Sequence, residues 1–486
     1  MKKFNLLLLL SFLIINSCKK EDDEDPNIIR LETDIEVSDF IWRGLNQYYY
    51  WQESVSNLSD SKLDNESEYA YYLSQNSDPD SFFNSLLHPD DRFSWIVDDY
   101  KDLENMLQGI ADSDGMEFGL YVECNDVNVF GFVRYVHKNS DAELKGIKRG
   151  MLFSEIDGTR LSRDNYGDLL FNNQSNSYTI KFSELSYNEN NQCANITTGT
   201  NNITLVKSRL VKNPVHISKI LEVEGKKIAY LMYNQFLGVV DSENKDYNLE
   251  LNNIFSNYKS ENVDELIIDL RYNPGGRIST SINLASMITG QFNNQIFAKE
   301  RWNSKLMNYW EENNPERIIN RFTDKLDNNI QISSLNLNRL YVITTSRSAS
   351  ASELLINGLD PYIDVIHIGD YTTGKNQGSI SVYDYINDSG DKNPNHKYAM
   401  QPIVLKIGNV AGYTDFPNGL TPDIIKKESI SNPGILGDPE EPLLKIALDN
   451  IRGVQSNISQ AEYYKQIEKP TDKIYQMIEV DKKAIE

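Results

Sequence analysis

Hydrophobic residues recur at helical spacing in the first part of the chain. Between residues 35 and 106 they include many aromatics, as in the segments 40–51 and 81–87. Apolar side chains three and four positions apart lie on one face of a helix, so this stretch predicts an N-terminal helical module. We expect its aromatic side chains to form the core of the module rather than a cage for a ligand.

The pattern changes after residue 106. From 107 to 210 apolar and polar residues alternate in short runs, which predicts a β domain. The strands expected there are 118–122, 129–136 and 178–182.

From 215 to 450 apolar strands alternate with helical stretches, which is typical of an α/β domain. The strands expected there are 228–233, 266–270, 340–344, 365–368 and 402–407. The tail, 451–486, is charged with scattered aromatics and carries no motif. The pattern therefore predicts a multidomain α/β protein.

The first 18 residues have the pattern of a secretory signal. A positive start precedes an apolar run at 4–15, about 12 residues, which is too short to span a bilayer as a helix. Residues 15–18, Ile-Asn-Ser-Cys, resemble a bacterial lipobox, which implies that Cys18 is lipidated and anchors the protein to a membrane. The alternative is an ordinary signal peptide cut nearby.

Residues 19–34 form a charged stretch that cannot bury itself, so we expect a solvated tether. Its lysines followed by acidic residues resemble the surface-export signals of Bacteroidetes lipoproteins, although a linker alone explains them equally well. The expected location is the cell envelope, as an outer-membrane lipoprotein on the periplasmic or the surface-exposed face.

Charge and cysteine content argue against several classes of function. The 486 residues carry 48 Lys and Arg against 71 Asp and Glu, a net charge of −23, which disfavours nucleic acid as a partner. Three cysteines, with no C-x-x-C pair and no clustered histidines, point away from a disulfide scaffold and a zinc site, and we expect no metal or cofactor. Cys124 and Cys193 remain after lipidation, and their spacing does not decide whether they pair.

Residues 140–158 carry a recognisable local pattern. They read as a short helix capped by Ser140 and closed at Gly146, then a glycine turn and a strand ending in Asp-Gly. This string resembles a PDZ domain.

That resemblance implies that the β domain binds a peptide as an added strand, with the backbone amides of a loop receiving the terminal carboxylate. The loop is expected near 115–119, which makes Met116, Glu117, Phe118 and Gly119 candidate substrate-binding residues. Glu117 would repel a carboxylate. The alternative is that the domain orients or gates a neighbour.

Three segments of the α/β domain carry candidate chemistry. Residues 269–276 follow a predicted strand and end in Gly275 and Gly276, where backbone N–H groups could form an oxyanion pocket or simply a tight turn. Residues 346–353 hold four serines at a strand-to-helix turn, a place for a nucleophile or for an N-cap. Lys375 lies on a glycine-flanked loop, and a desolvated lysine there could act as a base, whereas an exposed one could not.

Together the three segments resemble the C-terminal processing peptidases, or tail-specific proteases. Members couple a PDZ domain to a ClpP/crotonase-like α/β core and use a serine–lysine dyad. Residues 350–353 read Ser-Ala-Ser-Glu, Lys375 follows Ser350 by 25 positions, and residues 419–424 resemble the family's late G-x-x-P-D turn. The helical module resembles that of Bacteroidetes members more loosely.

The resemblance implies a serine endopeptidase of protein or peptide substrates. Ser350 would be the nucleophile and Lys375 the general base, while the N–H groups of Ala351 and of Gly275 or Gly276 would bind the oxyanion. Family members often carry a glutamine four residues after the lysine. Here position 379 is serine, so Ser379, Gln377 or the backbone would support the lysine.

Three alternatives stay open. A Ser-His-Asp triad would need one of the five histidines, none of which has a motif around it: His88, His137, His216, His367 and His396. A proteolytically inactive envelope protein could use the same fold to bind a peptide or another ligand, although the intact Ser350–Lys375 pair argues against it. Acyl-CoA chemistry would need a basic phosphate-binding cluster, which the sequence lacks.

Overall fold

The computed structural model describes residues 33–172, 175–188, 193–456, 465–467 and 478–479. The signal segment, Cys18 and nearly all of the predicted tether lie outside this part of the chain. Within it, no helix is long and apolar enough to cross a membrane.

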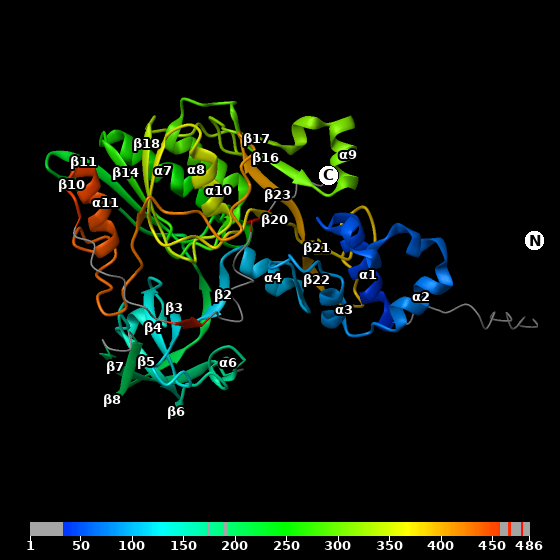
Figure 1. Ribbon diagram of the computed structural model, residues 1–486, viewed down its shortest axis with the longest axis horizontal. Helices are drawn as coiled ribbons and strands as arrows, with labels where there is room; N and C mark the ends of the chain where they lie inside the picture. The colour runs from blue at the N-terminus through cyan, green and yellow to red at the C-terminus, as the bar shows by residue number, and fades with distance from the viewer. Residues whose placement is uncertain (1–32, 173–174, 189–192, 457–464, 468–477, 480–486) are drawn as a thin grey trace, which may run out of the picture.

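Helices form the N-terminal module, drawn in blue in Figure 1. They are α1 (Thr33–Tyr48), α2 (Glu66–Ser74), α3 (Pro79–Ser85) and α4 (Tyr100–Leu107). Side chains of Asn65 and Asp78 cap α2 and α3 by accepting backbone N–H groups. The aromatics Trp42, Tyr49 and Phe83 are fully buried, which confirms that they are core residues.

The module is continuous with the α/β domain. Its buried aromatics belong to the same hydrophobic cluster as the core of that domain. Strand β1 (Trp95–Val97) pairs with β22 (Ala399–Gln401), which in turn pairs with β21 (Val382–Tyr383). The helical module, from Thr33 onward, is therefore built into the α/β domain.

The β domain lies below the α/β domain in Figure 1. Its strands are β3 (Met116–Val122), β4 (Val129–Val136), β5 (Leu152–Ile156), β7 (Ser177–Asn188) and β8 (Cys193–Val206), and they confirm the three runs predicted from the sequence.

Helix α5 (Asp141–Leu144) begins after Ser140, whose hydroxyl accepts the N–H of Glu143, and Gly146 follows with φ of 77°. This local pattern is the one expected from the sequence. Cys124 and Cys193 form a disulfide, so the turn after β3 is tied to the start of β8.

The α/β domain is built on a sheet in the order β10-β11-β14-β18-β19-β24. Its strands are β10 (Val215–Val223), β11 (Lys226–Tyr233), β14 (Glu265–Asp269), β18 (Arg339–Thr344), β19 (Asp364–Gly369) and β24 (Ile424–Ile425). All neighbours are parallel except the β10–β11 hairpin.

Helices cover both faces of this sheet, which explains its continuous apolar runs. On one face lie α7 (Tyr247–Ser260), α8 (Ile278–Thr289) and α10 (Ala351–Leu359), and on the other lies α11 (Pro442–Arg452). Successive residues alternate between the faces: Leu231 packs with the first group and Tyr230 with α11.

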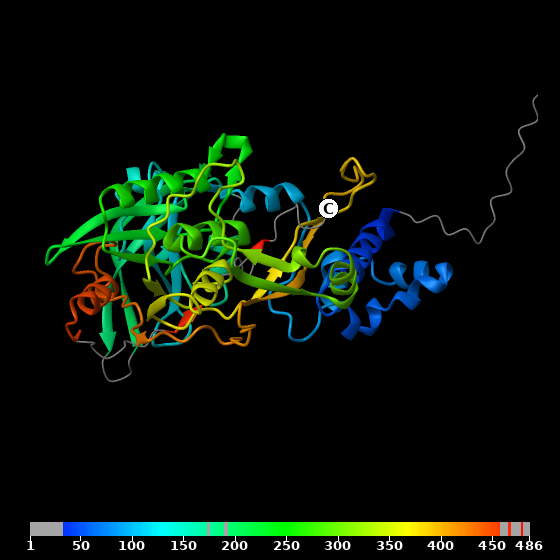
Figure 2. The same cartoon turned by 90° about the horizontal axis from the view of Figure 1, so that it is seen from above.

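A second sheet extends the domain towards the N-terminal module, as Figure 2 shows from above. Its order is β15 (Gly276–Arg277), β26 (Ile478–Glu479), β20 (Gln377–Ser379), β23 (Ile403–Asn409), β16 (Ile296–Trp302) and β17 (Ile319–Arg321). Helix α9 (Ser304–Asn313) follows β16. The tail contributes β26 here and β25 (Gln466–Ile467) beside β3, so it is not a separate segment.

Candidate active site

Ser350 lies in the turn between β18 and α10, immediately before the helix. Its backbone has φ of 65° and ψ of −113°, a conformation that costs free energy for a residue with a Cβ and that tends to occur at functional sites. The turn is held by Ser348, whose hydroxyl donates to the Leu270 carbonyl and accepts the N–H of Thr345. Ser350 is fully buried, and its Oγ has no side-chain partner among the described residues.

Residues 273–276, called the glycine turn from here on, lie against this serine. The Asn273 backbone carbonyl accepts the Ala349 N–H at 3.1 Å and the Ser352 hydroxyl at 3.0 Å. The Asn273 side chain donates from Nδ2 to the Tyr233 carbonyl. Asn273 therefore fixes residues 273–276 beside the first turn of α10. That turn includes Ala351, whose N–H lies among the first amides of the helix, which the helix's own ladder leaves unbonded.

The two glycines differ in what their amides can do. The Gly275 N–H donates to Asn273 Oδ1 at 2.9 Å, so in this structure it is not available to an oxyanion. Gly276 has φ of 138°, and a Cβ on it would lie 2.3 Å from the Phe236 carbonyl oxygen, so only glycine fits. Gly276 in turn pairs with Ile478 in the β15–β26 ladder, so which of the two amides binds an oxyanion stays a prediction.

Lys375 is fully buried in the loop that precedes β20. Burial lowers the pKa of Lys375 to about 7, against the opposing charges of Asp91 and Glu353. Its ammonium group lies 5.0 Å from the centre of the Phe93 ring. A lysine in this environment is partly neutral near pH 7 and can accept a proton.

Asp91 and Phe93 come from the N-terminal module, and sequence reasoning missed both. The neighbouring Arg92 donates to the Pro417 carbonyl, which fixes the segment on the α/β domain. The contact joins residues far apart in the chain, so no local pattern indicates it.

Glu353 links the serine to the lysine. Its Oε2 accepts the backbone N–H groups of Ser350 at 2.7 Å and of Lys375 at 2.9 Å, while its Oε1 accepts from Thr372 and Gly374. Burial raises the pKa of Glu353, and these hydrogen bonds oppose the shift. The serine-to-glutamate spacing of a capping box could have predicted its bond to Ser350, but nothing local indicates the bond to Lys375.

The residues expected to support Lys375 lie on β20. Gln377 begins this strand, and its Oε1 is buried without a partner among the described residues; Ser379 ends the strand and is also buried. A role for either as the lysine's support stays a prediction.

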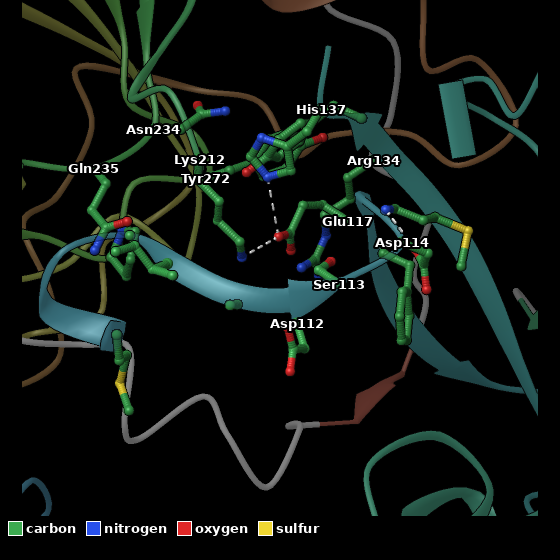
Figure 3. Close-up of a pocket in the computed structure, with 18 of the residues that line it drawn as sticks. Asp112, Ser113, Asp114, Glu117, Arg134, His137, Lys212, Asn234, Gln235 and Tyr272 are labelled. Atoms are coloured by element: carbon green, nitrogen blue, oxygen red, sulfur yellow. Dashed lines mark hydrogen bonds and ion pairs between the residues drawn. The ribbon is translucent and has the colours of Figure 1, made fainter. Parts of the chain in front are cut away.

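A cavity of about 370 Å³ separates the β domain from the α/β domain (Figure 3), and Met116, Glu117 and Phe118 line it. Glu117 Oε1 pairs with Lys212 Nζ at 2.8 Å and with His137 Nε2 at 3.4 Å. The Glu117 carboxylate, expected to repel an incoming anion, therefore has a cation beside it.

The expected loop near 115–119 is mostly strand, because Met116 to Gly119 belong to β3. The N–H groups of Gly115 and Met116 are bonded to the side chains of Ser113 and Asp114. They are thus occupied where a terminal carboxylate was expected. Gly119 does not line the cavity; a Cβ there would lie 2.5 Å from the Arg134 guanidinium.

Comparison with known families assigns this architecture. The model "Peptidase family S41" matches residues 227–424, and the model "Peptidase S41 N-terminal domain" matches residues 36–95. The chain belongs to peptidase family S41. It is therefore a serine-type peptidase. The β domain lies outside both matches, and no curated protein gives a significant match.

A solved structure shares the fold of this S41 peptidase. A candidate S41 protease from Bacteroides fragilis is 24% identical with a TM-score of 0.66, covering 86% of this chain and 98% of that one. A photosystem II D1 C-terminal processing protease is 16% identical with a TM-score of 0.48, covering 82% of this chain and 94% of that one.

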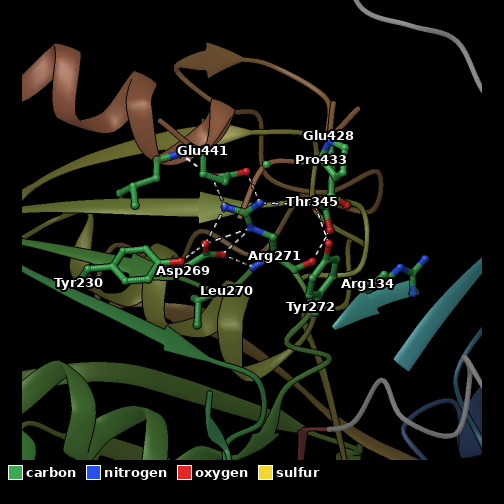
Figure 4. Close-up of polar contacts among 12 residues, drawn as sticks. Arg134, Tyr230, Asp269, Leu270, Arg271, Tyr272, Thr345, Glu428, Pro433 and Glu441 are labelled. Carbon is green, nitrogen blue, oxygen red and sulfur yellow. Dashed lines mark hydrogen bonds and ion pairs between the residues drawn. The ribbon is translucent and has the colours of Figure 1, made fainter. Parts of the chain in front are cut away.

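A buried ionic network joins the β domain of the peptidase to its glycine turn (Figure 4). Arg149 donates to Glu428 Oε1 and to the Tyr272 hydroxyl, both at 2.6 Å, and Tyr272 immediately precedes Asn273. Glu428 also contacts Arg271 at 3.4 Å. Burial alone would raise the pKa of Glu428, but the charges of Arg149 and Arg271 lower it to about 2.

The histidines of the peptidase have other partners. His88 stacks on Trp51, His216 lies against Tyr135, and His137 contacts Glu117. The His367 ring bonds to the Thr344 hydroxyl and that of His396 to Asp384. In the described part of the chain none of these contacts reaches Ser350, which favours the lysine as its base.

No group of three or more His, Cys, Asp or Glu residues within the described ranges is arranged to hold a metal ion.

Proposed function

We propose that the protein is an endopeptidase in which Ser350 and Lys375 form the catalytic dyad. The observation that carries this proposal is the buried lysine, whose pKa of about 7 suits a general base. Its backbone shares the Glu353 carboxylate with the backbone of Ser350. Strain at Ser350 and the fixed glycine turn support the same assignment.

The reaction we propose is acyl transfer. Neutral Lys375 takes the proton of the Ser350 hydroxyl while Oγ bonds to the scissile carbonyl carbon, and the N–H groups of Ala351 and of Gly275 or Gly276 bind the oxyanion. The C–N bond then breaks, and the Lys375 ammonium gives its proton to the leaving amine. Water then loses a proton to Lys375 and attacks the acyl-serine carbonyl carbon. The ester C–O bond breaks, Lys375 returns the proton to Ser350 Oγ, and the second product leaves as a carboxylic acid.

Cleavage of an unstructured protein tests this proposal. We expect the soluble chain starting after Cys18 to digest casein, and both Ser350→Ala and Lys375→Ala to lose at least about 10³-fold in kcat/KM. Lys305→Ala, which removes a partly exposed lysine paired with Asp60, is the matched control and should retain activity. Cleavage that persists in the Ser350→Ala variant would refute the dyad.

We further propose that the β domain acts as a PDZ-type module that binds or gates peptide substrates. The cavity beside β3 supports this role, because it opens between that strand and the Tyr272–Pro274 segment that leads to the glycine turn. Phe118→Ala should raise the KM for long substrates and leave the kcat for short peptides unchanged. Equal effects on both substrate lengths would contradict the proposal.

We propose that lipidated Cys18 anchors the enzyme in the cell envelope, on the periplasmic or the surface side of the outer membrane. The lipobox-like residues 15–18 support this location. Cys18→Ser should move the protein from the membrane fraction to the soluble fraction and abolish labelling by a fatty-acid analogue. Unchanged labelling would exclude Cys18 as the site.

A further inference from the structure

The C-terminal segment of the chain occupies the open edge of the β domain. Gln466 pairs with Tyr121 and Ile467 with Leu120 in an antiparallel register, and the Val122 N–H donates to the Lys465 carbonyl at 3.0 Å. Strand β3 would otherwise be an edge strand with unpaired backbone groups. The tail thus binds as an added strand, which is how extended peptides bind sheet edges.

Side chains reinforce this contact. Ile467 packs against the hydrophobic core of the β domain, and Lys465 Nζ lies 2.9 Å from Asp126 Oδ1. The register is antiparallel, so Gln466 and Ile467 run along β3 in the direction from Tyr121 to Leu120.

Further along the tail, β26 lies between β15, at the glycine turn, and β20, the strand that follows the Lys375 loop. Ile478 pairs with Gly276 and Glu479 with Arg277, so one side of β26 follows the glycine turn. On its other side Glu479 pairs with Ser379, on the strand that begins two residues after Lys375. A short red strand of the tail lies beside β20 in Figure 1.

A polypeptide cleaved at Ser350 must lie where its backbone reaches the glycine turn. The backbone of β26 already lies there, and in the same structure Ser350 and Lys375 are fully buried. The same chain therefore occupies both the candidate peptide-binding edge and the strand position at the candidate catalytic turn.

We propose that the C-terminal segment, through Lys465–Ile467 and Ile478–Glu479, is an intramolecular competitor of polypeptide substrates. The inference rests on the proposed function of Ser350 and the glycine turn. Contacts made by the backbone are tolerant of sequence, so the same edges accept an extended stretch of an unfolded protein once the tail leaves. Tethering gives the tail a millimolar effective concentration, which a dilute substrate must overcome.

The test uses the full chain, folded with its tail and then cut at a specific protease recognition sequence inserted after Ser456. We expect cutting followed by dilution to raise the rate of casein cleavage roughly tenfold, because the tail loses its tethered advantage. An added peptide of residues 465–486 should reverse the gain. The matched control carries a scrambled recognition sequence and receives the same protease treatment.

A binding measurement separates this inference from the proposed function. In the cut chain with Ser350→Ala, a labelled 465–486 peptide should bind saturably by fluorescence anisotropy and be displaced by casein. Saturable, displaceable binding without casein cleavage by any form would refute the proposed function and support the competitor role.

Three results would overturn the inference. They are an unchanged cleavage rate after cutting, absence of peptide binding to the cut chain, and loss of the folded circular dichroism signal on cutting. The last would make the tail a structural strand rather than a competitor.

Discussion

At the scale of single residues, the proposed dyad combines a serine in a strained backbone conformation with a fully buried lysine. Ser350 combines a positive φ with full burial, and the Lys375 side chain is also fully buried. Both features cost stability and are expected where chemistry is performed. Glycine and alanine at position 350 both remove the nucleophile but differ in their tolerance of the backbone conformation.

We therefore predict that Ser350→Gly is about 1 kcal/mol more stable than Ser350→Ala, because glycine adopts the positive φ without strain. Urea unfolding of the two variants measures the difference in free energy of unfolding. Replacement of Ser348, whose φ is not positive, by the same two residues is the control and should favour alanine. Equal stability of the two position-350 variants would show that the serine is unstrained.

At the scale of elements, hydrophobic patterning predicted most strands and helices of the fold. The apolar runs at 228–233, 266–270 and 340–344 correspond to β11, β14 and β18 because a sheet buried on both faces needs continuous apolar sequence. Ser140 and Gly146 similarly marked the ends of α5. Such signals are local, so they can be read along the chain.

Other parts of the site were beyond local patterns. Phe93 reaches Lys375 only through tertiary packing, and the two-residue strands β25 and β26 exist only because β3 and the glycine turn offer partners. The engaged Gly275 amide depends on one side-chain rotamer of Asn273. Spacing and resemblance predicted the Ser350–Lys375 pair but not the Glu353 carboxylate that links their backbones.

The disulfide also acts at this scale. Cys124 and Cys193 are 69 residues apart in sequence, and closing a loop of that size restricts the unfolded chain. We predict that Cys124→Ser with Cys193→Ser lowers the free energy of unfolding of the oxidised protein by roughly 2–4 kcal/mol. Denaturant unfolding with and without reductant measures it. A reductant effect that persists in the double variant would assign the stabilisation to something else.

At the scale of the whole molecule, three regions converge on one site. The N-terminal module covers Lys375, the α/β domain carries Ser350 and the glycine turn, and the β domain reaches that turn through Arg149 and Tyr272. With a pKa of about 2, Glu428 stays ionised throughout the range in which Lys375 titrates. The Arg149–Glu428 ion pair therefore keeps its charges over the pH range in which Lys375 loses its proton.

Removing Arg149 should lower the free energy of unfolding, because it leaves the buried Glu428 carboxylate without this partner. We predict that Arg149→Met destabilises the protein by about 3 kcal/mol, because Glu428 keeps its buried charge with one cation fewer, and that adding Glu428→Gln restores much of the loss. Urea unfolding of the single and double variants tests this coupling. Arg163→Met, which breaks an exposed pair with Asp126, should cost less than about 1 kcal/mol. Additive effects of Arg149→Met and Glu428→Gln would contradict a direct coupling.

The most direct test of the dyad is the pH dependence of kcat/KM for casein-derived peptides. The base works when neutral, so the rate should rise with pH through a midpoint at the Lys375 pKa of about 7. Asp91 raises that pKa, so Asp91→Asn should move the midpoint to lower pH, whereas Asp90→Asn, at an exposed carboxylate, should leave it in place. A midpoint that ignores Asp91, or a rate that falls as pH rises through this range, would contradict Lys375 as the base.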